Sequence, residues 1–437
     1  MRARSGAVIA VAFLVIGCAS SPQPSSGSSA GASASPAPIA SEGPSAPPSI
    51  SPTVAPVSPE PSVAAAPAWQ EVAPQAGGEM AGFGGGYVAL ANQDVDSKVF
   101  YSADGVTWKL VTLPFATSKD SHGNSLEART EAIASNGAQV IVVGGYFHPP
   151  CPTNSGGTGG GPACPSSPIA WLSSDGTHWQ SSYPWPGPGP ATGLKQGNQF
   201  MSVWPVPGNG WGAATMDVGG EEGSAGGIFR SANGLSWSRS SAPSPIRPGS
   251  SEATAFWHLG LGDAIGEQLV GGYWYPNGNQ QIGLFSAPDG KTWSAVKSFQ
   301  GANTSVVAGI APSDSLASLW ILAGTDAMTL PTVWTSPDLV TWTAHELPTL
   351  PGAEGSLNSI ALTHLGYVAL GQLSDGTDGN AYHSSWVSTD GLNWTQLDTP
   401  STKDGDGPDV LADGPGGVIG FALYNGASTP VGAWLLK

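Results

Sequence analysis

The chain has 437 residues and a formal net charge of −17, and only 10% of its residues are charged. A chain this acidic repels phosphate backbones, which argues against a nucleic-acid partner. Its 62 glycines and 17 tryptophans, with few lysines, are typical of an exported all-β protein.

Residues 1–17 have the pattern of a signal peptide. Arg2 and Arg4 form a short positive region, and the apolar stretch after them is shorter than a typical membrane span. It ends in Val-Ile-Gly before Cys18, which resembles the bacterial lipobox, where the cysteine is lipidated and becomes the mature N-terminus. We therefore expect an extracytoplasmic protein, anchored through Cys18 to a bacterial membrane at the cell surface or in the periplasm. An ordinary signal peptide with an incidental cysteine is the alternative.

Residues 18–67 form the next segment, which is rich in serine, proline, alanine and glycine. Such a composition cannot bury enough apolar surface to offset the entropy of ordering, so it predicts a disordered tether behind the lipidated cysteine. Residues 68–437 then form one predicted domain.

Within that domain a short motif recurs six times, first as SADGVTW at 102–108. In each copy Asp or Asn lies four residues before a Trp. The pairs are Asp104 and Trp108, Asp175 and Trp179, Asn233 and Trp237, Asp289 and Trp293, Asp338 and Trp342, and Asp390 and Trp394. Successive tryptophans are 49 to 71 residues apart, a period that predicts a propeller-like array of small sheets.

Each motif predicts a β-hairpin between two outer strands of a sheet. Asp-Gly favours a tight turn because both residues can adopt positive φ at little cost. The Ser before the Asp, and the Asp itself, can bind backbone N–H groups of the turn. The Trp is large enough to fill the space between one sheet and the next.

The chain ends predict a seventh sheet. Trp434 aligns with the aromatic residue that precedes each motif, and Trp69 supplies the Trp that would otherwise be missing. A strand from the N-terminus would then complete the sheet built by the C-terminus, which removes exposed edges. Seven apolar segments are the expected second strands: 87–91, 139–145, 210–216, 268–274, 319–325, 367–372 and 418–424. The predicted fold is therefore all-β, a single seven-bladed β-propeller.

The motif resembles the Asp-box, or BNR repeat, of sialidase-like β-propellers, Ser-x-Asp-x-Gly-x-x-Trp. Here Gly directly follows Asp, Leu339 replaces that Gly once, and Asn233 replaces the Asp once. The resemblance covers nearly all of the chain from residue 68 onward. It implies that the motifs are structural and lie on the face away from the ligand site.

Cys151 and Cys164 flank a glycine-rich insertion. Outside the cytoplasm a disulfide between them is the expected state. A metal site is the rival, but two cysteines with one nearby histidine are too few ligands for it. No metal site or cofactor is otherwise predicted. The acidic segments 374–380 and 403–409 leave a structural calcium ion open, although neither completes an EF-hand loop.

The loops between second and third strands, with the connections between sheets, are the expected ligand face. Acidic, basic and aromatic residues gather there. They are Asp94, Asp96, Asp120, His122, Arg129, Tyr146, Tyr273, Trp274, Tyr275, Asp375 and Asp378. Paired carboxylates could serve a glycosidase and aromatic rings could stack on sugars, but acids in glycine-rich loops are also ordinary turn formers.

Sialidase activity is not expected, even though the motif resembles that family. The resemblance implies three convergent arginines, and only Arg129, Arg230, Arg239 and Arg247 follow the signal peptide. Arg230 and Arg239 flank the third motif, so the triad cannot be assembled. The leading hypothesis is a monomeric, non-catalytic module that binds a carbohydrate or protein ligand. A glycoside hydrolase-like enzyme is the alternative, and a factor that assembles or folds membrane complexes is a third.

Overall fold

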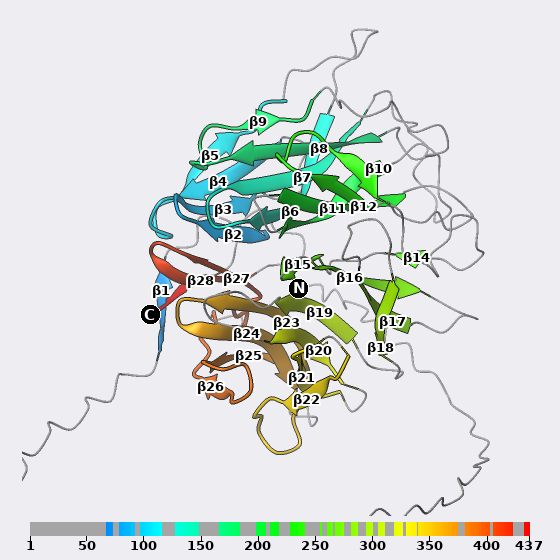
Figure 1. Ribbon diagram of the computed structural model, residues 1–437. Coiled ribbons are helices and arrows are strands. Elements are labelled where there is room, and N and C mark those ends of the chain that lie inside the picture. Colours follow the sequence, from blue (N-terminus) through cyan, green and yellow to red (C-terminus); the bar gives the residue numbers. More distant parts are fainter. Residues whose placement is uncertain are drawn as a thin grey trace, which may run out of the picture. The chain divides into compact units, whose positions relative to one another are not determined.

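The computed structural model describes residues 67–72, 78–91, 97–115, 127–147, 166–183, 198–206, 210–217, 228–240, 254–255, 260–264, 267–274, 281–286, 294–299, 305–310, 319–326, 329–338, 340–374, 381–402, 405–422 and 432–437. These belong to a compact unit that spans Ala64–Lys437. Every regular element in these ranges is a β-strand (Figure 1). No helix in them has the length and apolar character needed to cross a bilayer.

The strands of the described residues form seven antiparallel sheets, named here in chain order. The first sheet contains β2 (Met80–Phe83), β3 (Gly86–Leu90), β4 (Lys98–Ser102) and β5 (Lys109–Thr112). The second contains β6 (Glu127–Ser135), β7 (Val140–Phe147), β8 (Ser166–Ser173) and β9 (Gln180–Ser181). The third contains β10 (Asn198–Val206), β11 (Gly210–Asp217), β12 (Ile228–Ser231) and β13 (Ser238–Ser240).

The fourth sheet has five strands because two short strands pair with β16. It contains β14 (Thr254–Ala255), β15 (Gly260–Ala264), β16 (Glu267–Trp274), β17 (Gln281–Ser286) and β18 (Ser294–Phe299). The fifth contains β19 (Ser305–Ile310), β20 (Trp320–Thr325), β21 (Pro331–Ser336) and β22 (Thr343–Glu346). The sixth contains β23 (Glu354–Thr363), β24 (Gly366–Ser374), β25 (Ala381–Ser388) and β26 (Thr395–Leu397).

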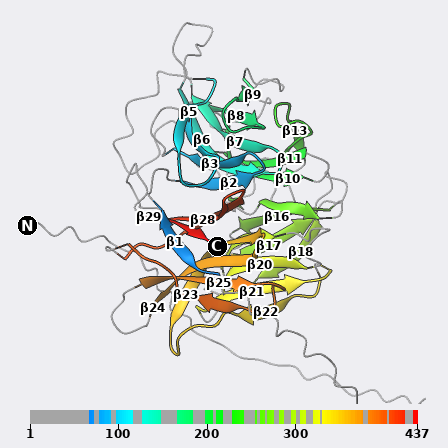
Figure 2. The ribbon, with the colours of Figure 1, turned by 90° about the vertical axis from the view of Figure 1, so that its left-hand side faces the viewer.

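The seventh sheet joins the two ends of the described chain. It contains β27 (Val410–Gly414), β28 (Gly417–Ala422), β29 (Gly432–Leu436) and β1 (Trp69–Val72). Figure 2 shows β1, in blue, beside β29, in red. Glu71 of β1 pairs with Trp434 of β29, and Trp69 lies two residues before Glu71. In the first sheet Leu110 pairs with Phe100, and Trp108 lies two residues before Leu110. Trp69 therefore has the same register in its sheet as Trp108 has in the first. An N-terminal strand therefore completes the sheet that the C-terminal strands begin.

All seven predicted second strands are confirmed as β3, β7, β11, β16, β20, β24 and β28, with small differences at their ends. The first strands of successive sheets also contact one another. These contacts run from β2 through β6, β10, β15, β19, β23 and β27, and β27 contacts β2 again. The contacts between the described sheets therefore form a closed cycle.

The repeated turn has the same two backbone hydrogen bonds to its Asp or Asn side chain in each described copy. In the first sheet Asp104 Oδ1 accepts bonds from the N–H groups of Val106 at 2.9 Å and Thr107 at 2.8 Å, and Ser102 Oγ accepts one from Gly105. Asp175, Asn233, Asp338 and Asp390 accept the corresponding pairs of bonds. The fourth-sheet copy, with Asp289 and Trp293, lies outside the described residues.

The turn differs from the predicted hairpin in one respect. Only the glycine has positive φ, which is 78° at Gly105, whereas Asp104 is not among the described residues with positive φ. The aspartate stays in an ordinary conformation because its carboxylate, rather than its backbone, closes the turn.

The tryptophan of the turn fills the space between sheets, as predicted. Trp108 donates from Nε1 to the carbonyl of Gly105 at 3.1 Å, and its ring lies 5.4 Å from that of Phe421 in the seventh sheet. Trp179, Trp237 and Trp394 make the same bond within their own turns.

Candidate functional site

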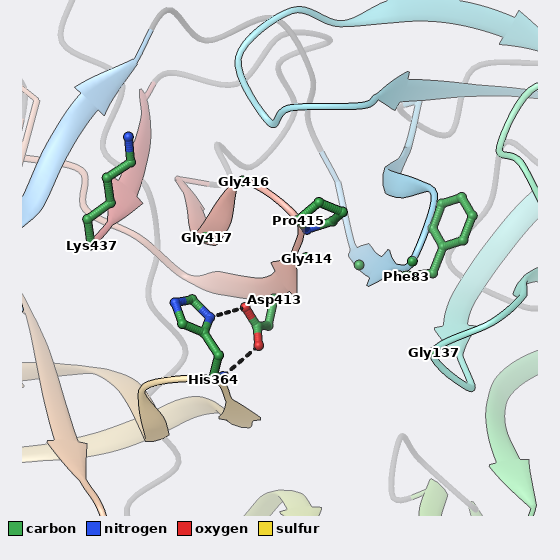
Figure 3. A pocket seen from close by; sticks show the side chains of 11 residues that line it. Phe83, Gly137, His364, Asp413, Gly414, Pro415, Gly416, Gly417 and Lys437 are labelled. Atoms are coloured by element: carbon green, nitrogen blue, oxygen red, sulfur yellow. Dashed lines mark hydrogen bonds and ion pairs between the residues drawn. The ribbon is translucent and has the colours of Figure 1, made fainter.

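A depression of about 700 Å³ lies where the turns between first and second strands of four sheets meet (Figure 3). Its lining is mostly glycine backbone. The lining residues are Gly82, Phe83, Gly84, Gly137, His364, Asp413, Gly414, Pro415, Gly416, Gly417 and Lys437. The turns between third and fourth strands emerge at the same end of each antiparallel sheet, so this depression shares a face with the repeated turns.

The turn between β27 and β28 forms one wall of the depression, and Tyr87 of the first sheet holds it in place. The Tyr87 hydroxyl donates to the carbonyl of Gly417 at 2.6 Å and accepts from the N–H of Gly416 at 2.9 Å. The side chain is fully buried, and this burial raises its pKa to about 12. Tyr87 therefore acts as a neutral clamp between the seventh and first sheets.

Close backbone packing requires glycine beside this wall. A Cβ atom on Gly82 would lie 1.7 Å from the carbonyl oxygen of Asp413, and one on Gly416 would lie 2.3 Å from that of Asp104. Gly82 lets β2 approach β27 closely, and Gly416 lets the turn between β27 and β28 approach the first repeated turn.

His364 and Asp413 are the paired polar side chains of the depression. The backbone N–H of His364 donates to Asp413 Oδ2 at 2.7 Å, and its Nδ1 lies 2.7 Å from Asp413 Oδ1. Because an ionised carboxylate only accepts, Nδ1 carries the proton and the Nε2 of a neutral ring is left as an acceptor. The His364 side chain is 51% exposed, so the ring is accessible to a ligand. In Figure 3 its Nε2 points away from the carboxylate.

A second polar cluster lies on the first strands of three sheets. Gln199 of β10 donates from Nε2 to Glu131 Oε1 at 3.3 Å. Glu131 is the extra residue of a bulge in β6, where the register shifts between Thr130 and Ala132. The carboxylate of Glu79, just before β2, accepts a bond from the backbone N–H of Ile133.

Both glutamates of this cluster have raised pKa values. Burial, together with the nearby charge of Glu131, raises the pKa of Glu79 to about 7, and the bond from Ile133 opposes the shift. Burial also raises the pKa of Glu131, which Arg129 counteracts. One carboxyl of the pair therefore holds its proton near neutral pH.

A partly buried histidine–aspartate pair joins the sixth and seventh sheets. His383 Nδ1 lies 3.4 Å from Asp409 Oδ1, with side-chain exposures of 9% and 17%. Asp409 and Asp406 belong to the acidic segment that left calcium open. Among the described residues no group of three or more His, Cys, Asp or Glu side chains could hold a metal ion. The remaining acid of the segment, Asp404, lies outside them, so the calcium hypothesis stays a prediction.

Most of the predicted ligand face falls outside the described residues. This holds for Asp94, Asp96, Asp120, His122, Tyr275, Asp375 and Asp378, and also for Cys18, Cys151 and Cys164. Tyr273 and Trp274 end β16, where their backbone pairs with Ala255 and Thr254. The choice of that face stays a prediction, and the depression described above lies at the opposite ends of the strands.

Tyr146 requires a correction, because it is not a surface residue. It is 7% exposed and its ring packs 5.4 Å from Phe115 and 5.3 Å from Tyr183. A ring enclosed in this way cannot offer its face to a sugar. Arg129, in contrast, is exposed on β6. Arg230 and Arg239 lie on β12 and β13, the outer strands of the third sheet, as expected.

The sequence did not single out His364, Asp413, Glu79 or Glu131. A signal existed for the first two, because they are 49 residues apart, close to the repeat period. His364 follows the end of β23 and Asp413 lies near the end of β27, so both are at the same end of a first strand. For the glutamates there was none, since a bulge cannot be read from an isolated strand.

No family model and no curated protein matches the sequence. Among solved structures the chain is similar to a Trypanosoma rangeli sialidase, at 12% identity and a TM-score of 0.40, over 84% of this chain and 55% of the sialidase. It is similar to an ulvan lyase, a polysaccharide lyase, at 9% identity and a TM-score of 0.48, over 84% and 95% of the two chains. A Penicillium chrysogenum α-L-arabinanase matches at 16% identity and a TM-score of 0.35, over 53% and 72%.

The chain thus spans about half the length of the sialidase that it resembles. None of these likenesses shows a family or decides what this chain binds.

Proposed function

We propose that this protein is a lipid-anchored, extracytoplasmic seven-bladed β-propeller that binds a ligand and catalyses nothing. The closed cycle of contacts between first strands supports the propeller, because a ring of small sheets buries each sheet against its neighbours. The repeated turn supports the Asp-box assignment, since an Asp or Asn side chain closes it in every described copy. The anchor at Cys18, the tether over 18–67 and the monomeric state are parts of the same proposal.

The lining of the depression supports the non-catalytic part of the proposal for this face alone, because the predicted ligand face at the opposite ends of the strands lies mostly outside the described residues. Asp413 is the only side-chain carboxylate among its 11 described lining residues, and both of its oxygens bind His364. Glycoside hydrolysis in most families needs two carboxyl groups that face each other across the bond. Backbone groups, one imidazole acceptor and the exposed Pro415 side chain suit binding of a carbohydrate or protein ligand.

A glycoside hydrolase-like enzyme is the second candidate, and the Glu79–Glu131 pair favours it. One carboxyl that is protonated near neutral pH beside another that can ionise is the arrangement a general acid and its partner need. The enzyme requires a glycan to reach this pair, whereas the binding module does not.

A glycan panel tests both. The compact unit, residues 64–437, is incubated with mixed cell-surface and plant glycans, and the retained and released fractions are analysed by mass spectrometry. We expect intact glycans to be retained, and retention to weaken in His364→Ala. Shortened glycans that disappear with Glu79→Gln would reject the binding module in favour of the enzyme. If nothing is retained or cut, carbohydrate is excluded and a protein partner is sought by affinity capture.

A further inference from the structure

The seventh sheet differs from the other six in how its outermost strand is held. In the other sheets the chain passes directly from the third strand to the fourth, which are β5, β9, β13, β18, β22 and β26. In the seventh sheet, β29 and β1 come from opposite ends of the described chain, and hydrogen bonds and packing alone join them.

The backbone part of this joint is short. Four residue pairs connect β1 to β29, and Ala68 and Lys437 exchange two further bonds of 2.9 and 3.2 Å. Gln70 and Glu71, half of β1, are exposed, whereas every residue of β29 is buried. Without β1, the edge of β29 would present unpaired N–H and C=O groups, which are a template for another strand.

The side-chain part is a slot shaped for an indole ring. A Cβ atom on Gly420 would lie 3.1 Å from two ring atoms of Trp69, so the missing side chain makes room for the ring. The ring packs against a buried cluster that includes Leu411 and Leu436. Its Nε1 donates to Ser385 Oγ at 3.1 Å, and Ser385 is fully buried and lies 2.8 Å from Thr399 Oγ1.

We propose that this groove, formed by the edge of β29 and the Gly420–Ser385 slot, accepts an extended tryptophan-bearing strand supplied by another molecule. The occupant that fits it is β1 of a second copy of this chain, because that strand brings the same tryptophan in the same register. Exchange of an identical element is a low-cost route to a dimer. The strand of the same chain has the higher effective concentration, so the exchanged dimer forms at high protein concentration. This inference does not depend on the proposed ligand.

The first test opens the groove in the full chain. Trp69→Ala removes the indole that holds β1, and the probe is a fluorescent peptide of residues 66–74, APAWQEVAP. Fluorescence anisotropy should show saturable binding to this variant and none to the wild-type chain at the same concentration. A peptide with alanine in place of tryptophan should bind with an affinity that is lower by about tenfold or more, because it cannot fill the slot.

Two variants locate the binding. Gly420→Leu, added to Trp69→Ala, fills the slot and should abolish peptide binding. Ser385→Ala, which removes only the acceptor for Nε1, should weaken it about fivefold. Circular dichroism and the thermal midpoint identify variants that fold. Two outcomes would contradict the proposed groove. One is that the peptide does not bind to a folded Trp69→Ala chain, and the other is that the peptide with alanine binds as tightly as the peptide with tryptophan.

The second test concerns the occupant. Wild-type full chains with and without ¹⁵N are mixed under reducing conditions at increasing concentration and examined by native mass spectrometry. Mixed dimers should appear, increase with concentration, and be lost when both copies carry Trp69→Ala. A chain that stays monomeric up to about millimolar concentration, or dimers indifferent to Trp69→Ala, would reject a second copy as the occupant.

Discussion

Asp413 of the seventh sheet holds both the backbone N–H and the ring Nδ1 of His364 in the sixth sheet, each at 2.7 Å. One carboxylate thus fixes the position of a neighbouring turn and the tautomer of its histidine.

Asp413→Asn leaves one acceptor oxygen for two donors and should lower the free energy of unfolding by about 1–2 kcal/mol. Urea denaturation measures this. Asp398→Asn removes an exposed carboxylate and should have almost no effect; equal losses in both variants would contradict the pairing.

The raised pKa of Glu79 predicts that stability falls as the pH rises. A carboxyl whose pKa is about 7 in the folded chain and 4.5 otherwise contributes fully below pH 4.5 and loses its contribution as the pH rises through 7. The loss is at most about 3 kcal/mol. Denaturation midpoints from pH 5 to 8 should decline less in Glu79→Gln than in the wild type. Glu127→Gln, an exposed change on β6, is the control, and parallel curves for all three proteins would contradict the prediction.

The repeated turn should tolerate Asn but not Ala at the Asp position. Asn233 Oδ1 accepts the bonds of the third turn at 3.0 and 2.8 Å, like Asp104 in the first. Asp104→Asn should therefore be nearly neutral. Asp104→Ala leaves two N–H groups without their acceptor and should cost about 1–2 kcal/mol. Urea unfolding compares them, and equal costs would show that the charge matters rather than the acceptor oxygen.

Cys151 and Cys164 should form a disulfide in protein recovered from outside the cytoplasm. Closing a loop of this length would add about 3 kcal/mol by the chain-entropy model. Peptide maps with and without reductant should differ by one cross-linked pair. Identical maps with both thiols free would reject the disulfide.

A fluorogenic sialoside should not be cleaved. Arg230 and Arg239 lie on the outer strands of the third sheet and Arg129 on the first strand of the second, so they do not form the triad that the family resemblance implies. Release of the fluorophore, abolished by Glu79→Gln, would overturn this expectation.

Local chemistry accounts for what the sequence predicted well. Ser, Asp, Gly and Trp close the repeated turn with bonds that span only three residues, so the motif alone specifies it. The position of Trp69 followed from the same register, because a missing member of a periodic pattern has a defined place. Tyr146 was wrongly predicted to lie on the ligand face. The sequence around an aromatic residue near a strand end is similar whether the ring lies on the surface or packs between sheets.

The sequence by itself determined the all-β class, the repeated turn and the meeting of the chain ends in one sheet. These depend on short-range hydrogen bonds and on strand periodicity. Only the tertiary structure decided that Asp413 meets His364, that Glu79 lies beside Glu131, and that Gly420 opens a slot for Trp69. Each of these joins neighbouring sheets or distant strands, and such contacts depend on how sheets pack rather than on any local pattern.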